Sequence, residues 1–307
     1  ADDNTAVGYQ SLVANTTGAS NVGIGRSALL ANTTGANNVA MGRDALAANT
    51  TAVSNVAVGH DAMATNTTGA YNVAMGDIAL RDNLDTNYNV AIGHNTLTVA
   101  TAADNTAMGV SALDHNSTGA NNVAIGRNAG NAITSGSFNV ILGSGADSAD
   151  VTSNYTNAFG YNIVGGAGYT TIGESTSDIR AAHGNTTWAT VSDERYKKDI
   201  VDSTAGLSFV NALQPRTFKY KNLGELPNTF SAYEADSTKV FKNSNTNHGF
   251  IAQEVKAAID ADSSIKDGFR LWDDRKDGSQ EVAEAALIPV LVKAIQELSA
   301  KNDALLA

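Results

Sequence analysis

The chain has 307 residues, no cysteine and 3 prolines, and its 20 Lys+Arg against 31 Asp+Glu give a formal net charge of -11. The acidic balance and the lack of a basic run argue against nucleic acid as the main partner. Without cysteine the chain has no disulfide and no thiol nucleophile. No apolar stretch approaches the roughly 20 residues of a membrane-spanning helix, so we expect no membrane insertion. Because a repeat is already under way at Asn4, we expect the chain to be part of a longer protein.

Charged residues and glycines divide the chain into two unlike parts. Residues 1–191 contain 5 Arg, no Lys, 13 Asp/Glu and 23 glycines. Residues 192–307 contain 15 Lys/Arg and 18 Asp/Glu but only 5 glycines. This change in composition predicts a domain boundary near the transition. We expect a repeat region at 1–180, a linker at 181–191 that carries a junction, and a second domain at 192–307.

The first part is an internal repeat marked by glycine and asparagine, and such periodicity predicts a repeat architecture. Successive glycines are 17 residues apart, except for one step of 16 and a last step of 13. These glycines are Gly8, Gly25, Gly42, Gly59, Gly76, Gly93, Gly109, Gly126, Gly143, Gly160 and Gly173. Four residues before most of them stands an asparagine, namely Asn4, Asn21, Asn38, Asn55, Asn72, Asn89, Asn105, Asn122 and Asn139.

Each repeat predicts one coil of a β-solenoid. Residues 22–24 and 39–41 alternate larger apolar and small side chains, which is typical of a short strand. A second apolar segment follows, as at Ala45-Leu46, and an Asn-Thr-Thr-Gly turn closes the cycle. Such a unit fits two strands of about five residues with two turns, and about eleven coils at ~4.8 Å make a rod about 50 Å long. Because so thin a rod buries little, we expect copies to associate through the alanine and glycine face.

The Asn-Val-Ala-Ile/Met-Gly repeat, with its Ala-Leu and Asn-Thr-Thr-Gly segments, resembles the head repeats of trimeric autotransporter adhesins over about residues 4–173. The resemblance implies a left-handed parallel β-roll that assembles as a homotrimer. Rolls of this kind occur on bacterial surfaces and on phage fibres alike. As partner we expect a host surface receptor, a glycan or another outer-surface component.

Glycosylation sequons recur in the repeat because the turn recurs. They open at Asn15, Asn32, Asn49, Asn66, Asn116, Asn154 and Asn185. We interpret them as turn residues with stacked side chains rather than as glycan acceptors.

Histidines and aspartates of the repeat give no pattern typical of a metal or catalytic site. His60, His94 and His115 stand in different coils with no second ligand at metal spacing, so we interpret them as exposed side chains and expect no metal and no cofactor. Aspartates that follow the strand glycines could line a stripe along the rod. A solvated stripe is favoured over the carboxylate pair of a glycoside hydrolase. These aspartates are Asp44, Asp61 and Asp77.

The second part opens with the motif Ser-Asp-x-Arg-x-Lys at residues 192–197. This motif resembles the signature of the intramolecular chaperone autoprocessing family, the self-cleaving C-terminal domains of phage tailspikes and tail fibres. Two further segments, His248–Val255 and Leu291–Leu298, match the same family. The resemblance therefore spans about residues 185–307 and coincides with the change in composition.

The resemblance implies cleavage of the peptide bond between Val191 and Ser192, with Ser192 as nucleophile and Lys197 as general base. A lysine takes the hydroxyl proton only when it is neutral, which requires a pKa lowered from about 10.4 toward 7–8. Asp193 and Arg195 are assigned to orientation and ion pairing. The spacing of nucleophile and base requires a bend or a helix start, and we expect the geometry to form after trimer folding. In the alternative, residues 192–193 cap a helix or turn and the lysines are solvated.

Periodicity predicts the remaining elements. Leu207, Val210 and Leu213 fit a short amphipathic helix, residues 216–220 a strand, and residues 251–259 a helix. Near the end, side chains step by three and four residues, which predicts the core of a parallel three-stranded coiled coil whose asparagine fixes the register. These residues are Ile288, Leu291, Ile295, Leu298, Asn302 and Leu305. The alternative is an ordinary amphipathic helix packed on its own domain.

Together these expectations describe an all-β parallel β-roll or solenoid of 17-residue repeats, homotrimeric, followed by an α+β chaperone domain with a long terminal coiled-coil helix. We expect a segment of a phage tail fibre or tailspike for host attachment, located in the virion tail and assembled in the host cytoplasm. Its C-terminal domain would promote trimerisation and folding and then release itself as a single-turnover Ser–Lys endopeptidase. Two alternatives stay open, a bacterial trimeric surface adhesin with a retained chaperone-like cap and a glycan depolymerase.

Overall fold

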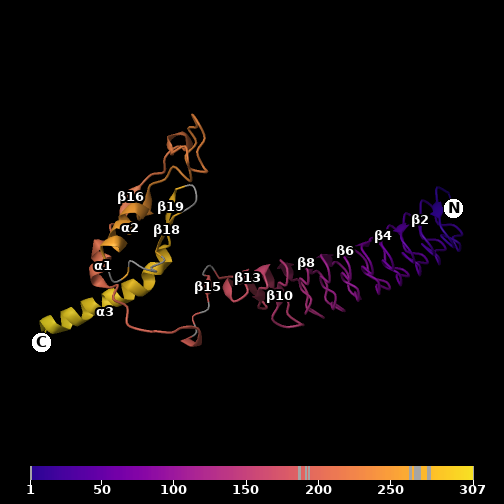
Figure 1. Ribbon diagram of the computed structural model, residues 1–307, viewed down its shortest axis with the longest axis horizontal. Coiled ribbons are helices and arrows are strands. Elements are labelled where there is room, and N and C mark those ends of the chain that lie inside the picture. Colours follow the sequence, from indigo (N-terminus) through magenta and orange to yellow (C-terminus); the bar gives the residue numbers. More distant parts are fainter. Residues whose placement is uncertain are drawn as a thin grey trace. The chain divides into compact units, whose positions relative to one another are not determined.

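A computed structural model describes residues 2–185, 188–190, 192, 194–262, 265, 271–274 and 278–306 (Figure 1). The chain forms two compact units, Ala1–Asp193 and Glu194–Ala307. The first unit is a β-solenoid, called the roll from here on, and the second is a small α+β domain with a long terminal helix. The predicted solenoid of 17-residue repeats and the predicted α+β domain with a long terminal helix are confirmed, whereas the homotrimer stays a prediction.

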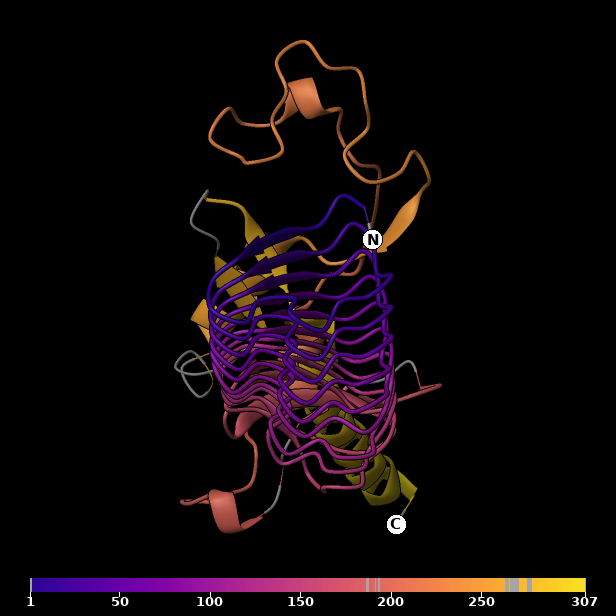
Figure 2. The ribbon, with the colours of Figure 1, turned by 90° about the vertical axis from the view of Figure 1, so that its right-hand side faces the viewer.

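Each repeat forms one coil of the roll and contributes one strand to a parallel sheet. Val39 pairs with Val56 and Ala40 with Ala57, so equivalent residues of successive coils lie side by side. The parallel strands are β1 (Thr5–Val7), β2 (Val22–Ile24), β3 (Val39–Met41), β4 (Val56–Val58), β5 (Val73–Met75), β6 (Val90–Ile92), β7 (Thr106–Met108), β8 (Val123–Ile125), β9 (Val140–Leu142), β11 (Asn157–Tyr161) and β13 (Tyr169–Glu174). Figure 2 shows the coils stacked on one another along the roll.

The second apolar segment of each coil is a turn, so the prediction of two five-residue strands per coil is wrong. Leu29, Leu46 and Leu80 have φ angles of 53°, 50° and 51°, in the left-handed region that interrupts an extended chain. This conformation costs an L-residue roughly 1–2 kcal/mol. Complete burial of each leucine side chain offsets that cost, because it stabilises the coil by about 1.5–3 kcal/mol.

The small residue of each strand faces the interior, which reverses the predicted assignment of the two strand faces. Ala40, Ala57 and Ala74 are completely buried and pack with the buried leucine column. The flanking residues point outward, and Met41 and Met75 are 41% and 42% exposed. The alanine and glycine face is therefore the core of the roll and is not available to another copy.

Buried asparagines join each coil to the next. The backbone N–H of Asn38 donates to Oδ1 of Asn21 at 3.0 Å, and Nδ2 of Asn38 donates to the carbonyl of Ala52 at 2.8 Å. Asn55 repeats the pattern one coil later, donating to Oδ1 of Asn38 at 3.0 Å and to the carbonyl of Gly69 at 2.8 Å. One side chain thus satisfies a backbone donor of the next coil and a backbone acceptor of its own.

A second asparagine column runs along the Asn-Thr-Thr-Gly turns. Nδ2 of Asn32 donates to Oδ1 of Asn15 at 2.9 Å, and Asn49 donates to Asn32 at 2.8 Å. The side chains of Asn32, Asn49 and Asn66 are completely buried. Stacked asparagines are therefore confirmed for these sequons, whereas Asn154 and Asn185 are exposed.

The strand glycines permit the close approach of successive coils. Gly59 has a φ of 140°, and a Cβ atom there would lie 2.2 Å from the carbonyl oxygen of Gly76. No side chain fits such a gap, so this column requires glycine.

The parallel stacking ends near residue 174. A short parallel pair, β10 (Asp147–Ser148) and β12 (Val164–Gly165), lies beside the last coils. Strand β14 (Ser177–Ala182) then returns antiparallel to β13, and β15 (Ala189–Thr190) pairs antiparallel with β14. The segment predicted as a linker therefore contributes to the sheet of the roll.

The C-terminal unit packs three helices around one small core. Its described elements are η1 (Glu194–Tyr196), α1 (Leu207–Ala212), β16 (Arg216–Phe218), η2 (Leu223–Glu225), β17 (Asn247–Gly249), α2 (Ala252–Ala261), β18 (Trp272–Asp274), β19 (Gln280–Val282), η3 (Glu284–Ala286) and α3 (Leu287–Leu306). The predicted helices and strand are confirmed. Phe209, Val255, Ile259 and Val290 lie in the buried core. Among the described helices, none is long and apolar enough to cross a membrane.

The asparagine column leads to a prediction about stability. Replacing Asn55→Ala leaves the backbone N–H of Asn72 without its side-chain acceptor, whereas the carbonyl of Gly69 keeps the hydrogen bond from Nδ2 of Asn66 at 3.0 Å. A buried unsatisfied donor costs about 1–3 kcal/mol, so we expect the free energy of unfolding to fall by about 1–3 kcal/mol. Chemical denaturation followed by circular dichroism measures the loss. The exposed Thr51→Ala serves as control and should change the value by less than about 0.5 kcal/mol; equal effects would contradict the proposed role of the column.

Candidate functional site

The predicted cleavage junction lies between the last strand of the roll and the first turn of the C-terminal unit. Strand β15 ends at Thr190, and η1 begins at Glu194. Ser192 is exposed between them. Val191 and Asp193 lie outside the described residues. The candidate nucleophile thus stands at the boundary between the two compact units.

A 3-10 helix shapes the segment between the candidate nucleophile and base. The backbone N–H of Lys197 donates to the carbonyl of Glu194 at 2.9 Å and closes the turn of η1. Arg195 lies within η1, and both Arg195 and Lys197 are exposed. Arg195 and Lys197 therefore lie on one short turn that begins two residues after Ser192 in the chain. The catalytic contact between Ser192 and Lys197 stays a prediction.

The segment 291–298, which lies in α3, contacts the first helix of the domain. Oε2 of Glu297, on α3, accepts the backbone N–H of Leu207 at 2.9 Å. Gly206, the residue before α1, provides no side-chain cap, and a Cβ there would lie 2.5 Å from Oε1 of Glu297. A carboxylate at the positive end of a helix is stabilising. Glu297 therefore acts as an N-cap supplied from a distant helix, a role that local sequence patterns do not indicate.

The motif segment at 248–255 is joined to strand β16. The guanidinium of Arg216 donates to both carboxylate oxygens of Glu254, at 2.9 Å and 2.7 Å. This bidentate pair lowers the pKa of Glu254 through hydrogen bonding to Arg216. Beside it, Oγ1 of Thr217 and Nδ1 of His248 are 3.2 Å apart. These residues connect β16, β17 and α2, so their described contacts are structural.

Helix α3 has two different apolar faces. Leu287, Val290 and Ala294 are buried against the C-terminal unit. The residues of the predicted heptad are on the exposed part of the helix: Ile288, Leu291, Ile295, Leu298, Asn302 and Leu305. Of these, Ile295 is 66% and Leu298 56% exposed. The helix thus packs on its own domain through one face and leaves the heptad face uncovered in the single chain.

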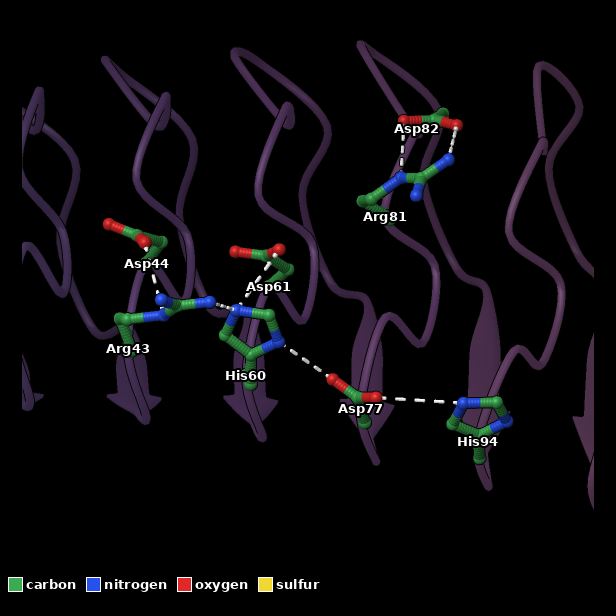
Figure 3. Close-up of polar contacts among 8 residues, drawn as sticks. All are labelled: Arg43, Asp44, His60, Asp61, Asp77, Arg81, Asp82 and His94. Carbon is green, nitrogen blue, oxygen red and sulfur yellow. Dashed lines mark hydrogen bonds and ion pairs between the residues drawn. The ribbon is translucent and has the colours of Figure 1, made fainter.

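A row of charged side chains follows the strand glycines on the roll (Figure 3). Nδ1 of His60 lies 2.8 Å from Oδ1 of Asp77, and Nε2 of His94 lies 3.5 Å from Oδ2 of the same aspartate. Asp77 therefore bridges histidines of the coils on either side of its own. All three side chains are 38–50% exposed, so the row is well solvated and contributes little to stability.

The same row continues toward the N-terminus. Arg43 contacts His60, and Nε of Arg43 lies 3.6 Å from Oδ2 of Asp44. Nε2 of His60 also lies 3.3 Å from Oδ2 of Asp61. The predicted stripe of exposed aspartates is present, and the histidines are part of it. Within the described residues, no group of three or more His, Asp or Glu is placed to hold a metal ion.

Comparison with known proteins identifies the beginning of the C-terminal unit. Residues 192–262 match the family model described as chaperone of endosialidase. The match begins at Ser192, the residue that follows the predicted cut. No curated protein and no solved structure matches the chain significantly.

The contact between Glu297 and α1 leads to a prediction. Replacing Glu297→Ala removes the acceptor for the N–H of Leu207. Loss of a helix N-cap costs about 0.5–2 kcal/mol, so the C-terminal unit should unfold at a lower temperature. Thermal loss of helical circular dichroism measures the change. The neighbouring exposed Gln296→Ala is the control, and a shift of the same size in both variants would contradict the assigned cap.

Proposed function

We propose that this chain, in which a chaperone-of-endosialidase segment follows a β-solenoid, belongs to a phage tail fibre or tailspike that attaches the virion to its host. Its C-terminal unit would assist folding of the trimer and then release itself by cutting between Val191 and Ser192. The family match that starts at Ser192, two residues before the second compact unit begins at Glu194, is the observation that carries the proposal.

The cleavage chemistry follows from the position of Ser192 immediately after the scissile bond. Lys197, when neutral, takes the proton of the Ser192 hydroxyl, and Oγ attacks the carbonyl carbon of Val191. The C–N bond breaks, the amine of Ser192 receives the proton, and an ester joins the two residues. Water then hydrolyses the ester with the same base. The products are a carboxylate at Val191 and a free amine at Ser192, and no co-reactant besides water is needed.

The exposure of the candidate nucleophile and base in the single chain supports a link between cleavage and trimer assembly. Ser192 and Lys197 are both exposed, whereas a lysine becomes neutral near pH 7 when it is removed from water or placed next to other cations. Neighbouring chains of a trimer would provide that environment. Cleavage would then occur after assembly and make it irreversible, because the released domain no longer assists unfolding or refolding.

Two uncovered apolar surfaces support a homotrimer. One is the heptad face of α3, where Ile288, Leu291 and Ile295 are 63%, 43% and 66% exposed. The other is the outward strand face of the roll, a column that contains no charged residue. It consists of Val7, Ile24, Met41, Val58, Met75, Ile92, Met108, Ile125, Leu142, Phe159 and Ile172. A long exposed apolar stripe is typical of an interface. The roll of a second copy carries the same stripe, with the same length and the same spacing between coils, so the two stripes can pack together.

The first test concerns cleavage. Wild-type chains should yield two pieces in denaturing electrophoresis, and Ser192→Ala or Lys197→Ala should leave the chain whole because nucleophile or base is missing. Native mass measurement should show trimers in each case. The matched controls Ser203→Ala and Lys221→Ala change exposed residues of the same domain and should be cut normally. Normal cleavage of Ser192→Ala would overturn the mechanism.

The second test concerns the coiled coil. Replacing Ile295→Asp places a charge on the heptad face and should reduce the trimer fraction at least about tenfold, since burying an unpaired carboxylate is strongly unfavourable. Light scattering of the full chain, in the Ser192→Ala background, measures the assembly. Gln296→Asp adds the same charge one position away, off the heptad face, and should leave the trimer intact. Trimers of unchanged stability in Ile295→Asp would contradict the proposal.

A further inference from the structure

One corner of the roll carries exposed aromatic side chains in a column that other coils fill with polar residues. The column is the residue before each coil's inward asparagine or threonine: Asp3, Ser20, Asn37, Ser54, Tyr71, Tyr88, Asp104, Asn121, Phe138 and Tyr155. Backbone hydrogen bonds join its members to the preceding coil, from Tyr88 to Ala70 and from Phe138 to Ala120 at 3.3 Å and 3.1 Å. The side chains therefore project from the same corner at steps of about 4.8 Å.

The aromatic residues form two stacked pairs. The ring centroids of Tyr71 and Tyr88 are 5.4 Å apart with planes 9° from parallel, and those of Phe138 and Tyr155 are 5.2 Å apart at 6°. Each ring remains 48–56% exposed. Because the partners come from adjacent coils, the ring faces look along the roll. One face of each ring covers its partner, and the other is turned toward the next coil.

The backbone of this column gives no reason to prefer aromatic residues. Tyr71, Tyr88 and Phe138 each have a φ of 60°, the left-handed region in which asparagine is favoured over bulky side chains. Asn37 and Asn121 occupy the same position of other coils with φ angles of 59° and 58°. Asparagine therefore meets the needs of the fold at this corner, and the exposed rings are better explained by a ligand.

Polar side chains stand between the two stacks. Tyr88 and Phe138 are three coils apart, about 14 Å at ~4.8 Å per coil. Asp104 and Asn121 occupy the two coils between them and are exposed. The outer face of Tyr88 is turned toward Asp104, and the outer face of Phe138 toward Asn121. The corner thus presents two aromatic faces with a carboxylate and an amide between them.

This combination fits a sugar chain. The C–H groups on one face of a pyranose ring pack against the electron-rich face of an aromatic ring, and its hydroxyls donate to a carboxylate and exchange hydrogen bonds with an amide. We propose that the corner from Tyr71 to Tyr155 binds a neutral glycan of the host surface through Tyr88, Phe138, Asp104 and Asn121. This proposal rests on the attachment function proposed above.

Charge argues for a neutral ligand and against a second copy of the chain. The column contains two aspartates, Asp3 and Asp104, and no Lys or Arg, so it repels sugars that carry carboxylate or phosphate groups. A copy docked on this corner would remove the Asp104 carboxylate from water without a cation from the column to pair it, which is unfavourable. The charge-free strand face is better suited to contacts between copies.

The test measures binding of the full-length trimer to immobilised glycans. The panel contains the neutral glycans dextran, mannan, chitohexaose and cellohexaose, together with anionic polysialic acid, hyaluronan and heparin. We expect binding to at least one neutral member and to no anionic member. Tyr88→Asn and Phe138→Asn should each weaken it by about tenfold. Both variants introduce the residue found at this position in other coils, so the roll should stay folded.

Tyr161→Asn is the matched control, because Tyr161 is 53% exposed but lies outside this column, and it should bind like the wild type. Failure to bind any neutral member, binding confined to anionic members, or unchanged binding by Tyr88→Asn and Phe138→Asn would each overturn the proposal. If these two variants formed fewer trimers than the wild type, the rings would lie in a contact between copies, and the proposal would be overturned as well. Trimer mass and chain cleavage, measured in parallel, test the proposed function separately from glycan binding.

Discussion

The roll depends on the hydrogen bonds that its buried asparagines make between successive coils. A coil of 17 residues encloses only a narrow core of alanine and leucine, yet its turns bring backbone N–H and carbonyl groups into that core. An amide side chain meets both needs, since it donates and accepts at once. Asn38 illustrates this: its side chain donates to the carbonyl of Ala52 and accepts from the N–H of Asn55. Because the asparagine side chains satisfy the backbone polar groups at the turns, small residues such as alanine are enough to fill the core between them.

The narrow core also explains why the chain leaves apolar surface uncovered. Alanine occupies the inward strand position, so the larger residues, such as Met41 and Met75, must face outward. In the C-terminal unit, α3 covers the domain core with one face and exposes Ile295 and Leu298 on the other. Both units therefore present apolar surfaces that a single chain does not bury. The two surfaces have complementary roles in the proposed assembly, because the heptad of α3 gathers chains and the strand face lets their rolls pack.

The spacing of asparagine and glycine was enough to predict the parallel coils, because both residues are required at fixed points by buried hydrogen bonds and by close backbone approach. The number of strands per coil was not predictable from the same pattern. Leu46 is typical of an extended or helical segment, and its left-handed φ arises from packing that only the stacked coils create. Alternation likewise predicted two strand faces without indicating which one is inside.

The C-terminal unit shows the same division between local and distant causes. Helices α1 and α2 follow from apolar residues spaced three and four apart. The cap that Glu297 provides to Leu207 joins residues 90 positions apart, and no local pattern indicates it. At the junction, motif spacing located Ser192 and Lys197 and predicted the turn between them. The catalytic contact proposed for them is a prediction, and it would depend on neighbouring chains of the proposed trimer.

The coil that begins at Asn89 has 16 residues, and it places Ala100 where the second asparagine column would continue. Strand register is nevertheless kept, with Val90 paired to Thr106. A residue can thus be lost on the turn side while the sheet continues unchanged. Rolls of this design can gain or lose whole coils, and they can exchange side chains at one corner, without disturbing their neighbours. The length of the roll and the side chains at its corner can therefore change independently of each other and of the core.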